Sequence, residues 1–205
     1  MKILAEHVEK KFRQEWVVRS FSYSFESGQS YALTGPNGSG KSTLLRILAQ
    51  YSLPSKGQVS FLHDNQSKIE ADQCHALVSY AAPYVELIEE FTLTELLNFL
   101  VQLKALPSQI SLSQFQDYIE LQPDKSKFIK NYSSGMRQKI KLGLALLGER
   151  PFLFLDEPTT NLDEKAKKWF YQKIQENRDR LIVIASNEEA EITLCEQRIS
   201  ILDFK

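Results

Sequence analysis

The segment from Gly35 to Thr43 constrains this chain more than any other part of its sequence. It satisfies the pattern GxxxxGK[ST], with the residues Gly35, Pro36, Asn37, Gly38, Ser39, Gly40, Lys41, Ser42 and Thr43. Glycines in such a loop let the backbone wrap closely around phosphate groups, so that successive N–H groups point at them. A strand-like run, Ser30 to Thr34, precedes the loop, and a helix-like run, Lys41 to Gln50, follows it. The helix would therefore present its positive end to the phosphates.

This pattern predicts a site for a triphosphate such as ATP. Lys41 is expected to reach the β- and γ-phosphates, and the hydroxyl of Ser42 to bind Mg²⁺. The alternative, an ordinary glycine-rich turn, is weak, because the bare pattern arises by chance in roughly 1% of chains of this length.

A second motif is an apolar run, Phe152 to Leu155, that ends in Asp156 and Glu157. It places two carboxylates at the carboxyl edge of a sheet, where α/β folds bind ligands. Asp156 is suited to hold Mg²⁺, directly or through water, and Glu157 to orient a water for attack on the γ-phosphate. Alone, such a pair is more often the start of a polar turn; beside a phosphate-binding loop, the catalytic interpretation is favoured.

The hydrophobic pattern predicts an α/β fold whose middle is helical. Strands are expected over residues 3–12, 16–18, 21–25, 30–34, 58–62, 76–81, 152–155, 181–184 and 198–202. Helices are expected over residues 41–50, 91–106, 111–121, 134–147 and 163–180. The continuous apolar runs 152–155 and 181–184 are typical of parallel strands covered on both faces. The central helices indicate an inserted subdomain.

Composition excludes several classes. The net charge of −1 provides no field that would attract nucleic acid. No stretch approaches the ~18 apolar residues of a membrane-spanning helix, and the N-terminus lacks the apolar core of a signal peptide. We therefore expect a cytoplasmic chain. Cys74 and Cys195 lack metal-ligand spacing and are expected to be reduced thiols in or near a core.

Between the two motifs, Tyr132-Ser-Ser-Gly-Met-Arg-Gln138 resembles the signature of ABC-type ATPases, usually written LSGGQ. After Glu157, the segment Pro158 to Asp163 is similar to the D-loop of that family. The resemblance implies a P-loop NTPase of ABC type: a mixed sheet core with an N-terminal antiparallel β subdomain and an inserted α-helical subdomain. Residues 1–205 would form a single nucleotide-binding domain, with 1–83 and 148–205 as the α/β core and about 84–147 as the helical subdomain.

The resemblance also implies partners. Two nucleotide-binding domains would pack head to tail with ATP between them, so that Ser133, Ser134 and Gly135 approach the γ-phosphate held by the second chain. Read alone, these residues would be an ordinary helix cap. A homodimer is favoured and a heterodimer is the alternative. Phe12 would stack on the adenine, with Trp16 as the second candidate and a core-facing strand aromatic as the alternative.

Four residues in three motifs depart from the family pattern. The signature has Ser134 and Met136 at its third and fifth places. Pro83 stands where a glutamine usually does, and Asn187 stands at the place of a histidine that contacts the γ-phosphate. Asparagine can donate a neutral hydrogen bond there but cannot shuttle a proton. We therefore expect slow ATP hydrolysis that depends on Glu157, Lys41 and Asn187.

The resemblance favours the ATP-hydrolysing subunit of an ABC transporter, acting on a separate membrane permease at the inner face of the cell membrane. Residues 83–99 would contact the permease, or would be a plain amphipathic helix. A hydrolytically degenerate ATP-binding partner in a heterodimer is the second interpretation. A soluble ABC protein acting on ribosomes or DNA ranks last. Within transporters the signature suggests an exporter, including the small haem-exporter type.

Overall fold

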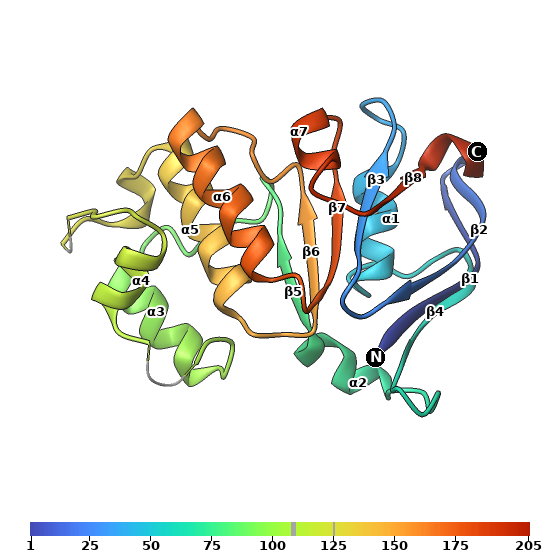
Figure 1. Ribbon diagram of the computed structural model, residues 1–205, viewed down its shortest axis with the longest axis horizontal. Helices are drawn as coiled ribbons and strands as arrows, with labels where there is room; N and C mark the ends of the chain where they lie inside the picture. Colours follow the sequence, from blue (N-terminus) through green and yellow to red (C-terminus); the bar gives the residue numbers. More distant parts are fainter. Residues whose placement is uncertain (108–109, 125) are drawn as a thin grey trace. The chain divides into compact units, whose positions relative to one another are not determined.

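The computed structural model describes residues 1–107, 110–124 and 126–205 (Figure 1). Residues 108, 109 and 125, which fall in the predicted helical subdomain, lie outside the described residues. The chain forms two compact units, each assembled from separate stretches of sequence. Unit 1 consists of Met1–Tyr80, Arg150–Glu157 and Asn177–Lys205, and unit 2 consists of Ala81–Glu149 and Pro158–Glu176.

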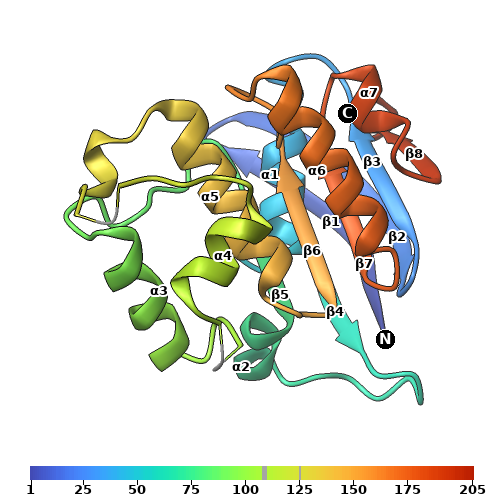
Figure 2. The same ribbon diagram turned by 60° about the vertical axis from the view of Figure 1, so that its left-hand side comes forward.

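A largely parallel sheet forms the centre of unit 1. Its strands follow the order β5-β6-β7-β3-β8, with the bounds β3 Ser30–Thr34, β5 Val78–Ala81, β6 Phe152–Asp156, β7 Leu181–Ala185 and β8 Gln197–Ser200. β3 pairs in parallel with both β7 and β8, and β6 pairs in parallel with β7 (Figure 2). Every residue of β3, β6 and β7 is buried. This confirms the prediction of strands covered on both faces.

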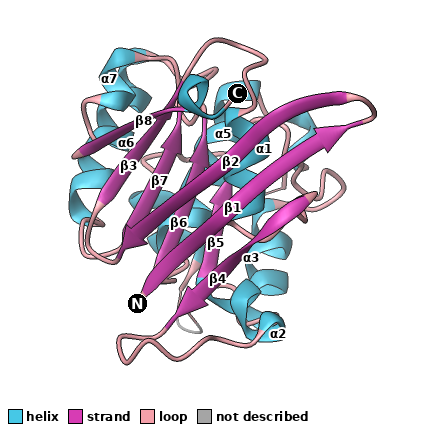
Figure 3. Cartoon of the chain, turned by 90° about the vertical axis from the view of Figure 1, so that its right-hand side faces the viewer, coloured by secondary structure: helices cyan, strands magenta, loops and turns pink. Residues whose placement is uncertain are grey.

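An antiparallel sheet in unit 1 has the order β2-β1-β4 (Figure 3). Its strands are β1 Lys2–Phe12, β2 Glu15–Glu26 and β4 Lys56–Leu62. β1 and β2 are joined by a tight hairpin in which Phe12 pairs with Glu15. Phe12 therefore lies near the tip of the hairpin.

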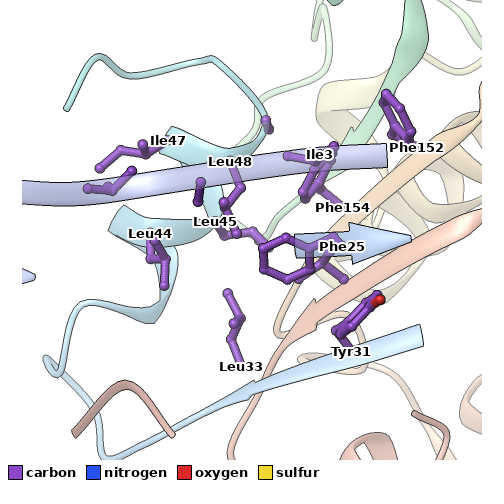
Figure 4. Packing of buried hydrophobic residues seen from close by; sticks show 14 of the residues in the cluster. Ile3, Phe25, Tyr31, Leu33, Leu44, Leu45, Ile47, Leu48, Phe152 and Phe154 are labelled. Atoms are coloured by element: carbon purple, nitrogen blue, oxygen red, sulfur yellow. The ribbon is translucent and has the colours of Figure 1, made fainter. Parts of the chain in front are cut away.

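The core of unit 1 is a cluster that joins both sheets to α1 (Lys41–Leu48). Leu44, Leu45 and Leu48 of α1 are fully buried, as the helical spacing predicts. They lie among aromatic and aliphatic residues of the strands, including Ile3, Phe25, Tyr31, Leu33, Phe152 and Phe154 (Figure 4). α1 directly follows the phosphate-binding loop, so this packing fixes the helix end that faces the loop.

Unit 2 contains α3 (Leu93–Gln102), α4 (Leu112–Tyr118), α5 (Ser134–Leu147) and α6 (Glu164–Glu176), with a 3₁₀ turn at Ile129–Asn131. Thr92 and Ser111 begin α3 and α4 with complete capping boxes, and Ser133 accepts a hydrogen bond from the amide of Met136 at the start of α5. α5 and α6 lie side by side (Figure 1). The bounds of α5 agree with the predicted helix over 134–147.

Several predicted bounds were wrong. The helix predicted over 163–180 ends at Glu176, because Arg180 instead turns to bond the carbonyl of Arg150 at 2.6 Å and the side chain of Asn177 at 2.9 Å. The strand predicted over 198–202 stops at Ser200, and a 3₁₀ turn, Ile201–Phe204, follows it. The strand predicted over 76–81 begins only at Val78, after the turn His75–Leu77. The short helices α2 (Ala71–Cys74) and α7 (Glu189–Ile192) were not predicted, because four residues carry no periodicity.

Two further expectations concern the membrane and the thiols. Among the described residues, no helix is both long and apolar enough to cross a bilayer. Cys74 and Cys195 are both free cysteines, Cys74 buried and Cys195 half-buried. Both thus lie in or near a core, as expected, and that they are reduced stays a prediction.

Candidate functional site

A pocket of about 300 Å³ opens at the phosphate-binding loop of unit 1. Its lining comes from the hairpin, the loop, the first residues of α1 and the end of β6. The lining residues are Phe12, Val17, Asn37, Gly38, Gly40, Lys41, Ser42, Thr43 and Glu157. Residues far apart in the sequence therefore meet at one place, and most of them belong to the predicted site.

The backbone of the loop requires glycine at Gly40, the residue before α1. Its φ is 103°, in the region that side chains disfavour, and a Cβ built there would lie 2.4 Å from Cγ1 of Val17. The amide of Leu44 bonds the carbonyl of Gly40, so the loop runs directly into the first turn of the helix. The helix thus begins at the pocket, and a helix N-terminus with unpaired N–H groups suits a phosphate.

Lys41 lies folded back on this loop. Its ammonium group donates hydrogen bonds to the carbonyl oxygens of Gly35, at 2.8 Å, and Pro36, at 3.3 Å. Burial lowers the pKa of Lys41, while the nearby carboxylates of Glu157 and Asp156 raise it. A buried ammonium beside the loop is well placed to exchange these carbonyls for phosphate oxygens.

Asp156 and Glu157 stand at the carboxyl end of β6, as predicted. Asp156 is only 1% exposed, whereas Glu157 lines the pocket. Glu157 has φ 41°, and its amide donates to the carbonyl of Ala185 at 2.9 Å. A non-glycine residue held in this region stores strain, and such residues cluster at functional sites.

The donors near Lys41 suit a hard cation. Ser42 lines the pocket, and the carboxylate of Asp156 lies close enough to Lys41 to raise its pKa. Hydroxyl and carboxylate oxygens are the ligands that Mg²⁺ prefers, with substrate phosphates completing its shell. Among the described residues, no group of three or more His, Cys, Asp or Glu side chains could hold a metal unaided. The residues therefore fit a cation that binds together with a nucleotide.

Asn187 lies directly beyond β7 and Ser186. Its side-chain amide donates a hydrogen bond to the side-chain oxygen of Asn37 in the phosphate-binding loop. Both residues are exposed. The contact brings a neutral donor, the amide of Asn187, to the phosphate-binding loop. The sequence did not predict Asn37 as its partner.

Phe12 is 48% exposed and lines the pocket. The ammonium of Lys10 lies 5.1 Å from the centroid of its ring and bonds the carbonyl of Leu53 at 2.7 Å. Trp16, the second candidate, instead lies beside three cations, those of Lys11, Arg19 and Lys56. The pocket side of the hairpin therefore presents Phe12.

The signature residues belong to unit 2. Ser133, Ser134 and Gly135 line a second pocket, of about 420 Å³, together with Asn161 and the first residues of α6. Gly135 packs on the backbone of the predicted D-loop, since a Cβ built there would lie 2.8 Å from the carbonyl oxygen of Asn161. The start of α5 and the D-loop thus form one surface within unit 2.

Three polar side chains of α5 make contacts that the sequence did not predict. Gln138 donates to the carbonyl of Pro158 at 2.9 Å, directly after Glu157 in the chain. Lys139 is 6% exposed and lies 4.9 Å from the ring centroid of Trp169, and burial lowers its pKa. Lys141 bonds the carbonyl of Pro83. Polar residues of an amphipathic helix are expected to face solvent. The sequence therefore contains no signal that these three side chains make buried or long-range contacts.

The predicted site residues therefore fall into two groups. Unit 1 brings together Phe12, the loop from Gly35 to Thr43, Asp156, Glu157 and Asn187. Unit 2 carries Ser133, Ser134 and Gly135. Each unit thus presents part of the predicted set.

Comparison with known proteins shows which family this chain belongs to. The sequence profile described as ABC transporter matches residues 18–160, from β2 to the D-loop. The chain belongs to the ABC transporter family. Related ABC proteins include the uncharacterized ABC transporter ATP-binding protein YybJ of Bacillus subtilis, 28% identical over 91% of this chain and 86% of its own length. The Nod factor export ATP-binding protein I of Burkholderia lata is 29% identical over 93% of this chain and 64% of its own length.

Larger ABC proteins also match. ATP-binding cassette sub-family A member 17 of the mouse is 31% identical over 90% of this chain, but the match spans only 11% of that protein. For a Dictyostelium discoideum relative, ABC transporter A family member 7, the corresponding share is 25%. The chain therefore spans a small part of some ABC relatives and most of YybJ.

Solved structures confirm the predicted fold class. A putative ABC transporter ATP-binding protein from Pyrococcus furiosus superposes with a TM-score of 0.81 at 20% identity, covering 100% of both chains. An ATP-binding cassette solved as a dimer in a post-hydrolysis state, with ADP and phosphate, gives a TM-score of 0.82 at 20% identity over 97% of this chain and 93% of that one. The mixed α/β architecture is that of ABC-type P-loop ATPases.

Proposed function

We propose that residues 1–205 form a single nucleotide-binding domain that binds and hydrolyses ATP to drive an ABC transporter. One observation carries the proposal: the unit 1 pocket gathers a phosphate loop, Lys41, Ser42 and Glu157 beside an exposed aromatic ring. Each of these groups matches one part of a nucleoside triphosphate.

The pocket residues divide the work of binding and hydrolysis. The loop amides and Lys41 hold the β- and γ-phosphates, and Phe12 stacks on the adenine. Glu157 accepts a hydrogen bond from a water and orients it toward the γ-phosphate. Asn187, which contacts Asn37 of the loop, donates a neutral hydrogen bond to the γ-phosphate. Hydrolysis through these groups is mostly positioning and charge stabilisation.

Ser42 and Asp156 are the residues that would hold Mg²⁺. When bound, the ion neutralises charge that develops on the phosphate oxygens. The rest of the polar chemistry at the pocket belongs to Lys41, Glu157 and Asn187.

A second nucleotide-binding domain completes the proposed site. Ser133, Ser134 and Gly135 lie at the N-terminus of α5, an end that suits a phosphate. We assign them to the γ-phosphate held by a partner domain, in a two-fold arrangement in which each chain supplies both halves. A homodimer is the simpler assembly, and a heterodimer is the alternative. Loss of the γ-phosphate would release this contact.

The transport role rests on the family. A separate membrane permease would hold the domain at the cytoplasmic face of the membrane, with contacts from residues 83–99. The printed name of the Burkholderia relative describes an export ATP-binding protein, which supports export.

A second candidate function is an ATP-binding partner whose own site hydrolyses poorly. Pro83 lacks a polar side chain, and Asn187 contacts Asn37 without a charge. In that case, ATP closes a heterodimer and the second chain supplies turnover.

The test is steady-state ATP turnover of the purified chain against its Glu157→Gln variant, with ATP binding measured separately. Glu157→Gln should reduce turnover at least about 100-fold and leave binding within about twofold, because the residue acts on the water. Equal turnover in both proteins would rule out hydrolysis at this pocket. Binding without turnover in either protein would favour the second candidate function.

A further inference from the structure

The ammonium group of Lys141 is bound to the chain just beyond β5. It donates a hydrogen bond to the carbonyl of Pro83, at 2.6 Å, and a longer one to that of Ala82, at 3.4 Å. The chain has entered unit 2 immediately before these residues, after Tyr80. Lys141 itself lies on α5, the helix that begins with the signature residues. One side chain therefore joins this entry segment to the signature helix.

The entry segment presents backbone carbonyl oxygens to Lys141. Proline offers a carbonyl oxygen but no backbone N–H, and its ring carries no polar group. The carbonyl of Ala82 already accepts the amide of Val85 at 3.1 Å, so the segment is a turn whose oxygens point toward Lys141. An ammonium group can serve two such acceptors at once.

Other charges around Lys141 agree with a bound, partly desolvated cation. Burial lowers its pKa, Arg137 on the same helix lowers it further, and Glu86, just beyond the entry segment, raises it. Hydrogen bonds from a charged donor are stronger than neutral ones, and more so away from water. The contact with Pro83 is thus a firm link rather than a loose surface bond.

Gln138, one turn earlier on α5, makes a parallel contact. It is 2% exposed and donates to the carbonyl of Pro158 at 2.9 Å. Pro158 is the residue at which the chain re-enters unit 2 after Glu157. The signature helix therefore holds two entry segments of its own unit, through Gln138 and Lys141.

From these contacts we infer that Lys141 is a positioning residue that makes the entry segment and the signature helix move as one body when ATP closes the dimer. The inference rests on the proposed function, because closure on ATP is part of it. Lys141 touches neither nucleotide nor water in this role.

A purely structural role makes a different prediction. If Lys141 only stabilised unit 2, its loss would lower the melting temperature and reduce nucleotide binding and dimerisation together. A positioning role predicts unchanged binding to the unit 1 pocket but weaker ATP-dependent dimerisation.

The experiment uses the full chain carrying Glu157→Gln, so that bound ATP is not consumed. Into it are introduced Lys141→Met, Lys141→Arg and, as a matched control, Lys168→Met at an exposed lysine of α6. A fluorescent ATP analogue reports binding, and sedimentation velocity with ATP and Mg²⁺ reports the dimer. Thermal melts check folding.

We expect Lys141→Met to raise the dimer dissociation constant about tenfold, the loss typical of one charge-assisted hydrogen bond, with binding unchanged. Lys141→Arg should recover most of the dimer, and Lys168→Met should match its parent. Dimerisation of Lys141→Met equal to that of the control would overturn the inference alone. So would a joint loss of binding and melting temperature that arginine does not restore. A parent that binds ATP but never dimerises would instead overturn the proposed dimer, and the inference with it.

Discussion

The backbone amide of Glu157 donates a hydrogen bond to the carbonyl oxygen of Ala185, at 2.9 Å. Glu157 follows β6, and Ala185 is the last residue of the neighbouring β7. The bond therefore holds the strained backbone of Glu157 beside the end of β7, two residues before Asn187. Glu157 and Asn187, which follow adjacent strands, would therefore contact the same bound nucleotide directly.

Asn187 is expected to supply part of the rate. Asn187→Ala should lower ATP turnover about 100-fold, the usual effect of losing one preorganised donor. Asn187→His should turn over faster than the natural chain, with a gain that is largest below about pH 6.5, where imidazole becomes a cation. The measurement is a pH profile of kcat for the three proteins. Turnover of Asn187→Ala at the natural rate would show that Asn187 does not act on the phosphate.

Phe12 is expected to bind the base of the nucleotide. Phe12→Ala should weaken ATP binding about 5- to 150-fold, because stacking on one base contributes about 1–3 kcal/mol. Phe12→Tyr should bind nearly as well as the natural chain. Trp16→Ala on the same hairpin is the matched control, and calorimetric titration with ATP provides the affinities. A larger effect of Trp16→Ala would assign the base to that ring instead.

The two loop glycines Gly38 and Gly40 separate backbone strain from steric clash. Both have positive φ, 76° and 103°, so alanine at either should cost about 1–3 kcal/mol of strain. Only the Cβ at Gly40 would meet Val17, at 2.4 Å, whereas the added Cβ at Gly38 has open space. Gly40→Ala should therefore also lose most ATP affinity. Urea unfolding and ATP titration would check this, and equal losses at both positions would contradict the clash.

Cys195 should make stability fall at alkaline pH. Burial, with Glu191 and Glu196 next in importance, raises its pKa to about 12 in the folded chain. An exposed thiol titrates near about 8.5, so the unfolded chain ionises first. The contribution is complete below about pH 8.5 and is lost as pH rises toward 12, by at most about 1.4 kcal/mol per pH unit.

Urea unfolding between about pH 9 and 11 measures that loss. The natural chain should lose stability more steeply than Cys195→Ala over this range. Parallel slopes in the two proteins would show that the folded thiol ionises as readily as the unfolded one.

Local signals predicted much of the fold. The helix predicted over 134–147 agrees with α5, Ser134–Leu147, and the apolar runs before Asp156 and after Arg180 predicted β6 and β7. Such elements are visible because their patterns lie within one stretch of chain. The predicted end of α6, residue 180, was wrong because Arg180 bonds the distant carbonyl of Arg150.

The candidate site was predicted as far as its motifs reach. The loop around Lys41 and the pair Asp156 and Glu157 are sequence motifs whose residue types predict phosphate and Mg²⁺ binding. The partners Asn37 for Asn187, and Pro83 for Lys141, depend on distances that only the folded chain sets. The sequence of a helix does not indicate which backbone carbonyl one of its lysines will bond.

The position of β3 in its sheet bears on how the chain is made. Both strands that pair with it, β7 and β8, come from residues 181–200, although β3 itself ends at Thr34. During translation the strand that leads into the phosphate loop therefore has no sheet neighbour until synthesis has passed Ala185, and it gains its second neighbour only after Ser200. A ribosome that stalls before Ala185 would leave an apolar strand unpaired, and such exposed edges attract chaperones and aggregation. The loop can then acquire its binding geometry only after the strands from residues 181–200 have been made.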